Sequence, residues 1–390
     1  MMPAVLRIFL AELRAIAGHR QVALVLLVAP FIYALFYPQP YIAEALRDVP
    51  ISVVDLDGSV ASRDLVRQID ATPDVTVART DLDFARATER VYSRDVSGVL
   101  VIPQFFERDL LHGRAAPVVL YADSSYFLVY QRLSTAVRSV ALSVGTGIEV
   151  ARLTATGVDP AVALTLTLAY PMPQTLVPLF NPQGGYATYV LPASFVLIVQ
   201  QILLMGIGML EPRRHLGPRL PHRSLLSAIN ASFDETLGRA LAVFAIEMII
   251  APFYLVVLPH LYGLPRLGAV ASILILIVPF LVAAIGFGLV IAALLRSSLA
   301  AQIVLAALGM PLFFLAGFAW PMEMMPPILY DVARLIPSTT AIDAFVRLSQ
   351  FGASWAEIQP QWQLLTLLAL GYFVLAVAIG AVRRYRAARP

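Results

Sequence analysis

Six long apolar stretches interrupt the chain, and each is close to the length that a helix needs to cross a bilayer. About 20 mostly apolar residues span a hydrocarbon core of roughly 30 Å. The first stretch is the shortest and contains Pro30. The pattern predicts an α-helical membrane protein with six transmembrane helices. The predicted spans are Gln21–Tyr37, Tyr186–Leu210, Ala240–Leu261, Gly268–Leu295, Leu299–Trp320 and Gln363–Val382.

Residues 38–185, between the first two spans, have ordinary polarity and alternate between strand and helix patterns. Such alternation favours a small mixed or parallel sheet covered by helices. The segment is therefore predicted to be an α/β domain with one long helix, in which Asp57 or Ser59 caps the first helix. The predicted strands are Ile51–Asp55, Val75–Val77, Gly98–Ile102 and Pro117–Tyr121, and the apolar run Leu164–Leu179 is expected to add another. The predicted helices are Val60–Ile69, Leu82–Tyr92, Pro103–Leu111 and residues 126–156.

All 28 basic side chains counted as Lys or Arg are arginines, and their placement predicts the orientation of the spans. The segments that would share one side of the membrane hold 13 arginines, in residues 1–20 and 211–239, at Arg296 and at the C-terminal end. The opposite short loops hold 3. Because arginine favours the cytoplasmic side, both termini are expected in the cytoplasm. Residues 38–185, with 12 arginines and 16 acidic side chains, are expected outside it.

The first 20 residues have the pattern of an amphipathic helix. Arg7 and Arg14 share one side. Ala43-Glu44-Ala45 resembles a signal cleavage site, but the segment before the apolar run is long and amphipathic. We therefore expect the first span to be retained as an anchor. The apolar side of the helix is formed by Val5, Leu6, Phe9, Leu10, Leu13 and Ile16.

The chain contains no lysine and no cysteine. A P-loop needs a lysine that reaches the nucleotide phosphates, and Schiff-base catalysis needs one as well. Without cysteine there is no disulfide, thiolate nucleophile or cysteine-ligated metal, and the 5 histidines are too scattered for a zinc site. A net charge of +3 gives no reason to expect nucleic-acid binding. No catalytic residue, metal or cofactor is therefore expected in this chain.

Glu247 lies near the middle of the third predicted span. A carboxylate there costs about 2.5–3.5 kcal/mol on insertion scales, so it should face the protein interior or an aqueous cavity. Two interpretations remain open. The residue belongs to a substrate pathway or a proton-linked site, or it makes a hydrogen bond between helices to Gln200 or Gln201 of the second span.

Residues 321–362, after the fifth span, contain several prolines that separate short apolar runs. Two short helices, Ile328–Leu335 and Ala341–Leu348, are predicted on either side of Pro337. This pattern favours a re-entrant or interfacial hairpin at the outer face of the membrane. Its marker residues are Gly317, Pro321, Pro326 and Pro337, and Trp320, Trp355 and Trp362 are expected to anchor it at the interface.

Several segments, taken in order, carry a resemblance to a known family. They are VVDLDGSVASRDLVRQI, GVLVIPQFFERDLLHG, VVLYADSS, Leu179–Pro182 before the second span, and Gly317–Pro321 with Pro326 and Pro337. Their order and spacing resemble the membrane (permease) subunit of type-2 ATP-binding-cassette exporters, in the six-span branch with a large periplasmic insertion after the first helix. The resemblance implies a bacterial cytoplasmic (inner) membrane protein that forms a homo- or heterodimer and binds a separate ATPase subunit, which holds the ATP.

The resemblance also implies where that ATPase docks. Family members carry an acidic-Arg-acidic-x-Gly-Thr run after the second span, and here the aligned stretch is Arg213–Pro218, which keeps only Arg214 and Gly217. A later Gly-Lys element appears as Gly238-Arg239. The cytoplasmic loop 211–239 and the N-terminal helix are thus expected to form the docking surface. Its candidate residues are Arg7, Arg14, Glu211, Arg213, Arg214, Gly217, Asp234, Glu235, Gly238 and Arg239.

Three functions remain open on the sequence. The first is an exporter permease that moves amphiphilic small molecules, drugs or lipids, with a periplasmic adaptor protein and membrane lipid as further partners. The second is a membrane-anchored protein whose outer domain binds a ligand or a partner, as in a sensor or in envelope assembly. The third is an ion-coupled transporter that uses Glu247. A cytoplasmic share of about 70 residues in four pieces is too small for an enzyme or output domain, which favours the first function.

Overall fold

The computed structural model describes residues 3–169, 180–181, 184–210, 224–295 and 298–387. The chain divides into two compact units. The helical unit comprises Met1–Glu44 and Pro178–Pro390, and the sheet unit comprises Ala45–Val177.

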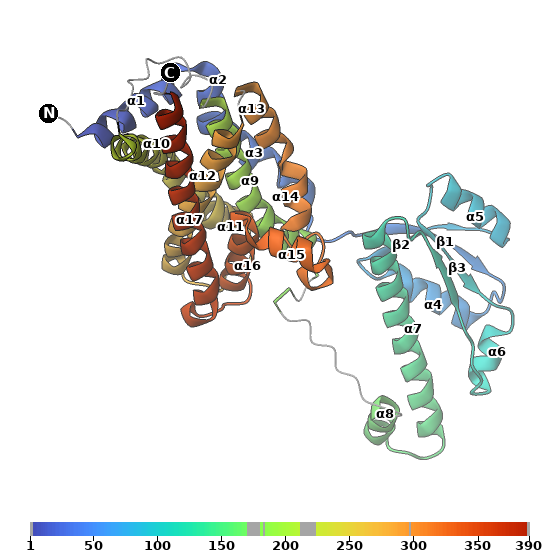
Figure 1. Ribbon diagram of the computed structural model, residues 1–390. Coiled ribbons are helices and arrows are strands. Elements are labelled where there is room, and N and C mark those ends of the chain that lie inside the picture. The colour runs from blue at the N-terminus through green and yellow to red at the C-terminus, as the bar shows by residue number, and fades with distance from the viewer. Residues whose placement is uncertain (1–2, 170–179, 182–183, 211–223, 296–297, 388–390) are drawn as a thin grey trace. The chain divides into compact units, whose positions relative to one another are not determined.

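The helical unit is built from apolar helices that pack side by side (Figure 1). Five of its described segments are long and apolar enough to cross a membrane, namely Arg20–Tyr41, Tyr186–Leu210, Leu225–Leu261, Val270–Leu294 and Trp355–Arg386. The predicted fifth span is a shorter apolar segment here, Leu299–Leu315, so six crossings remain a prediction. The helices of the first half are α1 (Ala4–Gly18), α2 (Arg20–Ala23), α3 (Ala29–Phe36), α9 (Tyr186–Leu210), α10 (Leu225–Pro252) and α11 (Leu258–Leu261). Those of the second half are α12 (Val270–Leu294), α13 (Ser298–Ala307), α14 (Gly309–Leu315), α15 (Pro327–Arg334), α16 (Pro337–Ser349) and α17 (Trp355–Ala387).

Two of the long segments contain a π-helical turn shortly before a proline. Leu24–Val28 precedes Pro30, and Phe253–Val257 precedes Pro259. A proline ring inside a regular α-helix clashes with the preceding turn and removes one hydrogen bond, and a wider π-turn is a common site of such irregularity. Tyr254 sits in the second π-turn, and its hydroxyl donates to the carbonyl of Pro30. The first and third long segments are therefore fastened together where both are irregular.

Glu44 closes the N-terminal end of α9. Its backbone carbonyl accepts from the amide of Tyr186 at 2.6 Å. Its carboxylate accepts from the amide of Thr188 at 3.2 Å and from the Thr188 hydroxyl at 2.8 Å. A carboxylate at a helix N-terminus satisfies free amides and complements the helix dipole. The residue that ends the first part of the helical unit thus serves as the cap of its second part.

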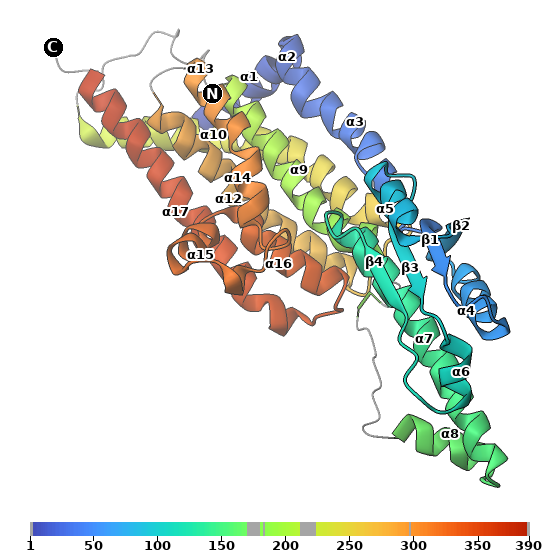
Figure 2. The same cartoon turned by 90° about the vertical axis from the view of Figure 1, so that its right-hand side faces the viewer.

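The sheet unit has four strands in the order β2-β1-β3-β4. β1 (Val49–Asp55) pairs in parallel with β2 (Val75–Thr80) and β3 (Gly98–Ile102), and β4 (Val119–Ala122) pairs antiparallel with β3. Strand side chains on one face pack with α4 (Val60–Asp70) and α7 (Phe127–Ala155), and those on the other face pack with α5 (Phe84–Tyr92). Figure 2 shows α7 as one long helix. Because β1 and β3 are covered on both faces, their sequences are almost wholly apolar.

Each of the four strands overlaps a predicted segment, and β3 has the predicted bounds. Ser59 caps α4 by accepting from the amide of Ser62. Two expectations for this unit are wrong. The helix expected to begin at Pro103 is α6 (Phe106–Leu111), because Phe105 adopts a left-handed conformation, with a φ of 67°, that a helix cannot include. The strand expected in Leu164–Leu179 is contradicted by the helix α8 (Pro160–Ala169), and residues 170–179 lie outside the described part of the chain.

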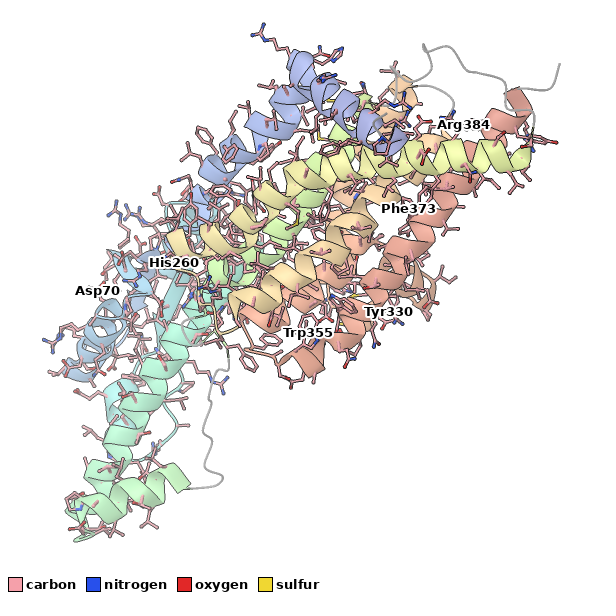
Figure 3. All side chains as sticks on the ribbon, turned by 90° about the vertical axis from the view of Figure 1, so that its left-hand side faces the viewer. Asp70, His260, Tyr330, Trp355, Phe373 and Arg384 are labelled. Atoms are coloured by element: carbon pink, nitrogen blue, oxygen red, sulfur yellow. The ribbon has the colours of Figure 1, made fainter. Side chains whose placement is uncertain are left out.

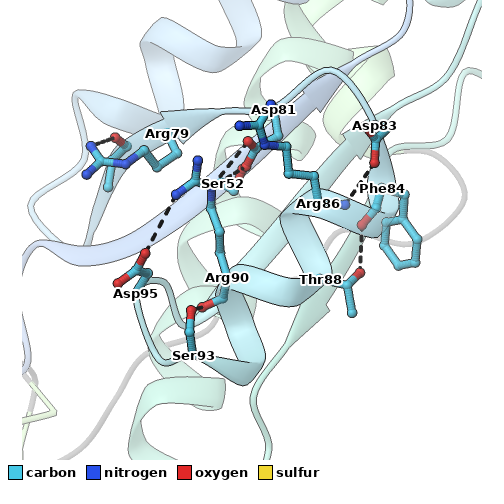
Figure 4. Close-up of polar contacts among 11 residues, drawn as sticks. Ser52, Arg79, Asp81, Asp83, Phe84, Arg86, Thr88, Arg90, Ser93 and Asp95 are labelled. Carbon is cyan, nitrogen blue, oxygen red and sulfur yellow. Dashed lines mark hydrogen bonds and ion pairs between the residues drawn. The ribbon is translucent and has the colours of Figure 1, made fainter.

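A buried polar network joins β1 to the segment after β2 and to α5 (Figure 4). The Ser52 hydroxyl donates to Asp81 at 2.7 Å, and Arg90 Nε donates to the same carboxylate at 3.0 Å. The hydrogen bond from Ser52 lowers the pKa of Asp81, burial opposes the shift, and Arg90 lowers the pKa further. Folding therefore favours the ionised carboxylate.

Asp81→Ala is expected to lower the opening free energy of the sheet by about 2–3 kcal/mol, because Ser52 and Arg90 lose their buried acceptor. The contribution of Asp81 is complete above the unfolded pKa of about 3.9 and is lost as the pH falls through the lowered folded pKa. Hydrogen exchange of β1 and β2 in the full-length protein measures both effects. Asp64→Ala, which removes a carboxylate 45% exposed, is the control, and equal exchange in the two variants would contradict the prediction.

Candidate functional site

The helix α1, which carries the candidate docking residues Arg7 and Arg14, packs on α10. Gly238 of α10 faces α1, and a Cβ on Gly238 would lie 2.8 Å from Cβ of Ile8 and 2.9 Å from the carbonyl oxygen of Val5. Ile8 was not among the residues of the predicted apolar face. Arg7 and Arg14 are exposed, as the amphipathic pattern predicts. The absence of a side chain at Gly238 therefore sets the distance between the two helices.

The prediction of a loop over residues 211–239 is wrong in its second half, which is helical. α10 begins at Leu225, and the Ser224 hydroxyl caps it by accepting from the amide of Ser227 at 3.2 Å. Ser224 followed by an apolar run is a helix-start signal, so the sequence contained the information. Asp234, Glu235, Gly238 and Arg239 are helical residues. Glu211, Arg213, Arg214 and Gly217 lie outside the described residues.

Glu235 connects α10 to the last helix. Its carboxylate pairs with Arg239 on α10 and with Arg384 on α17. The three side chains are only 22%, 17% and 28% exposed, respectively. Glu235 and Arg239 therefore hold helices of this chain together, whereas Arg7 and Arg14 of the same candidate set face outward.

The two ends of the helical unit differ in character. Figure 1 shows α1, α2 and the end of α17 at one end, which we call the arginine-rich end. Arg384 lies near that end of α17, and Trp355 begins the helix at the other end, which we call the hairpin end (Figure 3). The described parts of both termini thus share one end, as the arginine count predicts, and their cytoplasmic orientation remains a prediction.

Glu247 is fully buried, and neither carboxylate oxygen has a hydrogen-bond partner among the described residues. The predicted bond to Gln200 or Gln201 is wrong. Gln200 donates to the Ser338 hydroxyl at 2.9 Å, and Gln201 donates to the carbonyl of Leu305 at 3.0 Å. The Gln200 amide faces α16 and the Gln201 amide faces α13, because α9 contacts both of these helices as well as α10. A buried carboxyl group without a partner favours the pathway interpretation.

Two short helices, α15 and α16, form at the hairpin end as predicted, and their place at the outer face of the membrane remains a prediction. Gly317 has a φ of 84° after the end of α14, a conformation that favours glycine. Pro321 and Pro326 flank a single 3-10 turn, and Pro337 is the first residue of α16, a position that suits proline. Two boundaries are wrong: α16 begins at Pro337 and not at Ala341, and α17 already begins at Trp355, so residues 355–362 belong to the last helix. The helix begins there because the acidic Glu357 accepts from the Ser354 amide at 2.7 Å.

A cavity of about 710 Å³ lies between the hairpin, the helices α9 and α17, and the segment that follows α14. This volume falls in the range of small-molecule sites, which is about 300–1,000 Å³. The carboxylate of Asp343 in its lining is paired with a cation: Arg347 donates to it at 2.7 Å, and Gln361 of α17 donates to it at 2.8 Å. The guanidinium of Arg334 lies 5.7 Å from the centre of the Tyr330 ring. Aromatic lining is supplied by Phe180, Tyr189, Phe318, Tyr330 and Phe351.

The cavity can bind a molecule that has both apolar and polar parts. Rings supply apolar contact area, and the amide, hydroxyl and ion-paired groups supply a few hydrogen bonds. Sequence reasoning singled out the prolines and glycine that shape the hairpin and missed every one of the ring and ion-pair residues. These residues come from four separate segments, and no spacing along the chain indicates that they meet.

The helical packing, the capped insertion and the two dissimilar ends are features of a membrane transport subunit. The family described as ABC-2 family transporter protein matches residues 21–378, and the chain belongs to this family. The chain is similar to the linearmycin resistance permease protein LnrN of Bacillus subtilis (strain 168), with 24% identity over 86% of this chain and 88% of the relative. It is also similar to the inner membrane transport permease YhhJ of Escherichia coli (strain K12), with 22% identity over 96% and 95%. A third relative, the probable multidrug ABC transporter permease YbhS of Escherichia coli (strain K12), is 24% identical over 41% of this chain and 42% of the relative.

Proposed function

We propose that this chain is the permease subunit of an ATP-driven exporter in the cytoplasmic membrane of a bacterium, and that it works as a dimer with a separate ATPase subunit. The family membership supports the transport role. The absence of lysine supports the division of labour, because nucleotide chemistry of the P-loop type needs that residue. ATP hydrolysis is therefore assigned to the partner.

The cargo we propose is an amphiphilic small molecule, a drug or a lipid. The observation that carries this class is the cavity at the hairpin end, with its aromatic lining and its ion pair between Asp343 and Arg347. The names of two relatives, one a resistance permease and one a probable multidrug permease, support the same class. The sheet unit is proposed to lie outside the membrane, where it is available to a periplasmic adaptor protein.

Affinity purification from native membranes tests the proposal directly. We expect a second polypeptide with a P-loop lysine to copurify, and the complex to hydrolyse ATP. Reconstituted vesicles should then move a fluorescent amphiphile only when ATP is present. A chain that purifies without any ATPase and moves the probe in response to an ion gradient would contradict the proposal and support the ion-coupled alternative.

A further inference from the structure

We propose that the ion pair between Glu235 of α10 and Arg384 of α17 couples the arginine-rich end of the chain to the hairpin at the other end, with α17 as the connecting element. The inference rests on the proposed function, in which an ATPase docks at the arginine-rich end. Glu235 and Arg384 act here as positioning residues, since their contacts are with other helices of this chain.

One stripe of α17 faces the start of α10. The Ser232 hydroxyl donates to the carbonyl of Val377 at 2.8 Å, and the rings of Phe233 and Phe373 meet edge to face at 5.7 Å. Gly380 lies directly against Ser232. Phe373, Val377, Gly380 and Arg384 follow one another at spacings of four, three and four, which places them on one helical face. Arg384 is the charged end of this otherwise uncharged stripe.

The same helix reaches the hairpin without a break. α17 has 33 residues, which corresponds to roughly 50 Å of helix. Near its other end Gln361 donates to Asp343 of α16 at 2.8 Å, and in the middle of the helix the Tyr372 hydroxyl donates to the carbonyl of Leu335. A displacement of α17 at the arginine-rich end is therefore carried to the walls of the cavity.

The ion pair with Arg384 decides whether α10 can move α17 along its axis. Among the described residues, the stripe also contacts α10 through the Ser232 hydrogen bond and the edge-to-face rings of Phe233 and Phe373, which are neutral contacts. A charge-assisted pair has a defined geometry and is stronger than a neutral hydrogen bond. Glu235 is held from its own helix by Arg239, so its carboxylate is already oriented toward α17.

Three variants separate coupling from folding. Arg384→Gln removes the link between the helices and leaves the pair of Glu235 with Arg239 intact. Arg386→Gln is the matched control, because this substitution removes the same charge at an exposed position of the same helix. The double variant Glu235→Arg with Arg384→Glu again places one carboxylate between two arginines and is expected to restore the link.

The readout uses the natural absence of cysteine. Spin labels at Ile328→Cys on α15 and Leu261→Cys on α11, both exposed at the hairpin end, report the movement of the hairpin in the purified complex with its ATPase. ATP with vanadate is expected to change the distance between the labels. Arg384→Gln should lower the equilibrium constant between the resting and the ATP-dependent distance populations at least about fivefold, the lower end of allosteric coupling, while ATP hydrolysis continues. Arg386→Gln and the double variant should behave as the unsubstituted chain.

The outcomes distinguish the two levels of the proposal. A response in Arg384→Gln equal to that of the unsubstituted complex overturns the coupling role alone. A double variant that assembles but does not respond also overturns it, because a restored pair should restore the movement. If the unsubstituted chain brings down no ATPase, the proposed function fails and the coupling role fails with it.

Discussion

Gly238→Leu is expected to lower the amount of ATPase that copurifies with the chain at least about tenfold, equivalent to about 1.4 kcal/mol. A Cβ at this position already meets Ile8 and the backbone of Val5 at less than 3 Å, and a leucine has three further carbon atoms. Overpacking of this kind costs about 1–3 kcal/mol unless the neighbour moves. α1 would be displaced from α10, and the exposed Arg7 and Arg14 would move with it.

Two further variants make this prediction specific. Gly238→Ala should have an intermediate effect, because only the Cβ is added. Gly371→Leu is the matched control, since no atom lies within 4 Å of the Cβ that it would add on α17. Quantitative copurification from equal amounts of monodisperse protein is the measurement. Full recovery of the ATPase with Gly238→Leu would show that the packing of α1 on α10 is irrelevant to docking.

Glu247→Leu is expected to stabilise the chain and to abolish transport. Both oxygens of Glu247 are buried without a hydrogen-bond partner among the described residues. Since a carboxyl group in a membrane span costs about 2.5–3.5 kcal/mol on insertion scales, hydrocarbon of similar size should raise the thermal unfolding midpoint. A costly group that is retained in a core is typical of a functional position, where stability and activity oppose each other.

Gln200→Leu provides the contrast. Gln200 is equally buried, and its amide nitrogen donates to the Ser338 hydroxyl, whereas its amide oxygen has no partner among the described residues. Its replacement removes that hydrogen bond and should lower the unfolding midpoint. The midpoints are measured on the detergent-purified complex and transport on reconstituted vesicles. A stabilised Glu247→Leu chain that still transports would remove Glu247 from the pathway, and a destabilised one would show that the carboxyl group has a structural partner.

Local signals in the sequence predicted much of the fold. Long apolar runs identify the five described segments that are long enough to cross a membrane, and short apolar runs between turn residues identify the four strands, because these patterns depend on a few neighbouring residues. Ser59 and Ser224 begin helices for the same local reason. Phe105 was missed because a left-handed aromatic residue contradicts its own conformational preference, and only the surrounding structure enforces it.

The candidate sites were harder to predict, because they depend on contacts between distant segments. Glu235 and Arg384 are 149 positions apart in the chain, and no spacing rule connects them. A hydrogen bond from Glu247 to Gln200 or Gln201 was one of two open interpretations, and the sequence does not determine which neighbouring helix each of these side chains faces. The ring residues of the cavity failed to stand out for a further reason, since aromatic residues are common in every apolar span.

Glu44 has a consequence for how this chain can change over evolutionary time. The sheet unit Ala45–Val177 interrupts the helical unit after Glu44, and a direct hydrogen bond joins Glu44 to Tyr186 at the start of α9. An insertion whose flanking segments already meet imposes little closure cost on its host, and the cost grows only slowly with its length. The sheet unit can therefore be lengthened, shortened or exchanged by recombination as a cassette, while the packing of the spans is inherited unchanged.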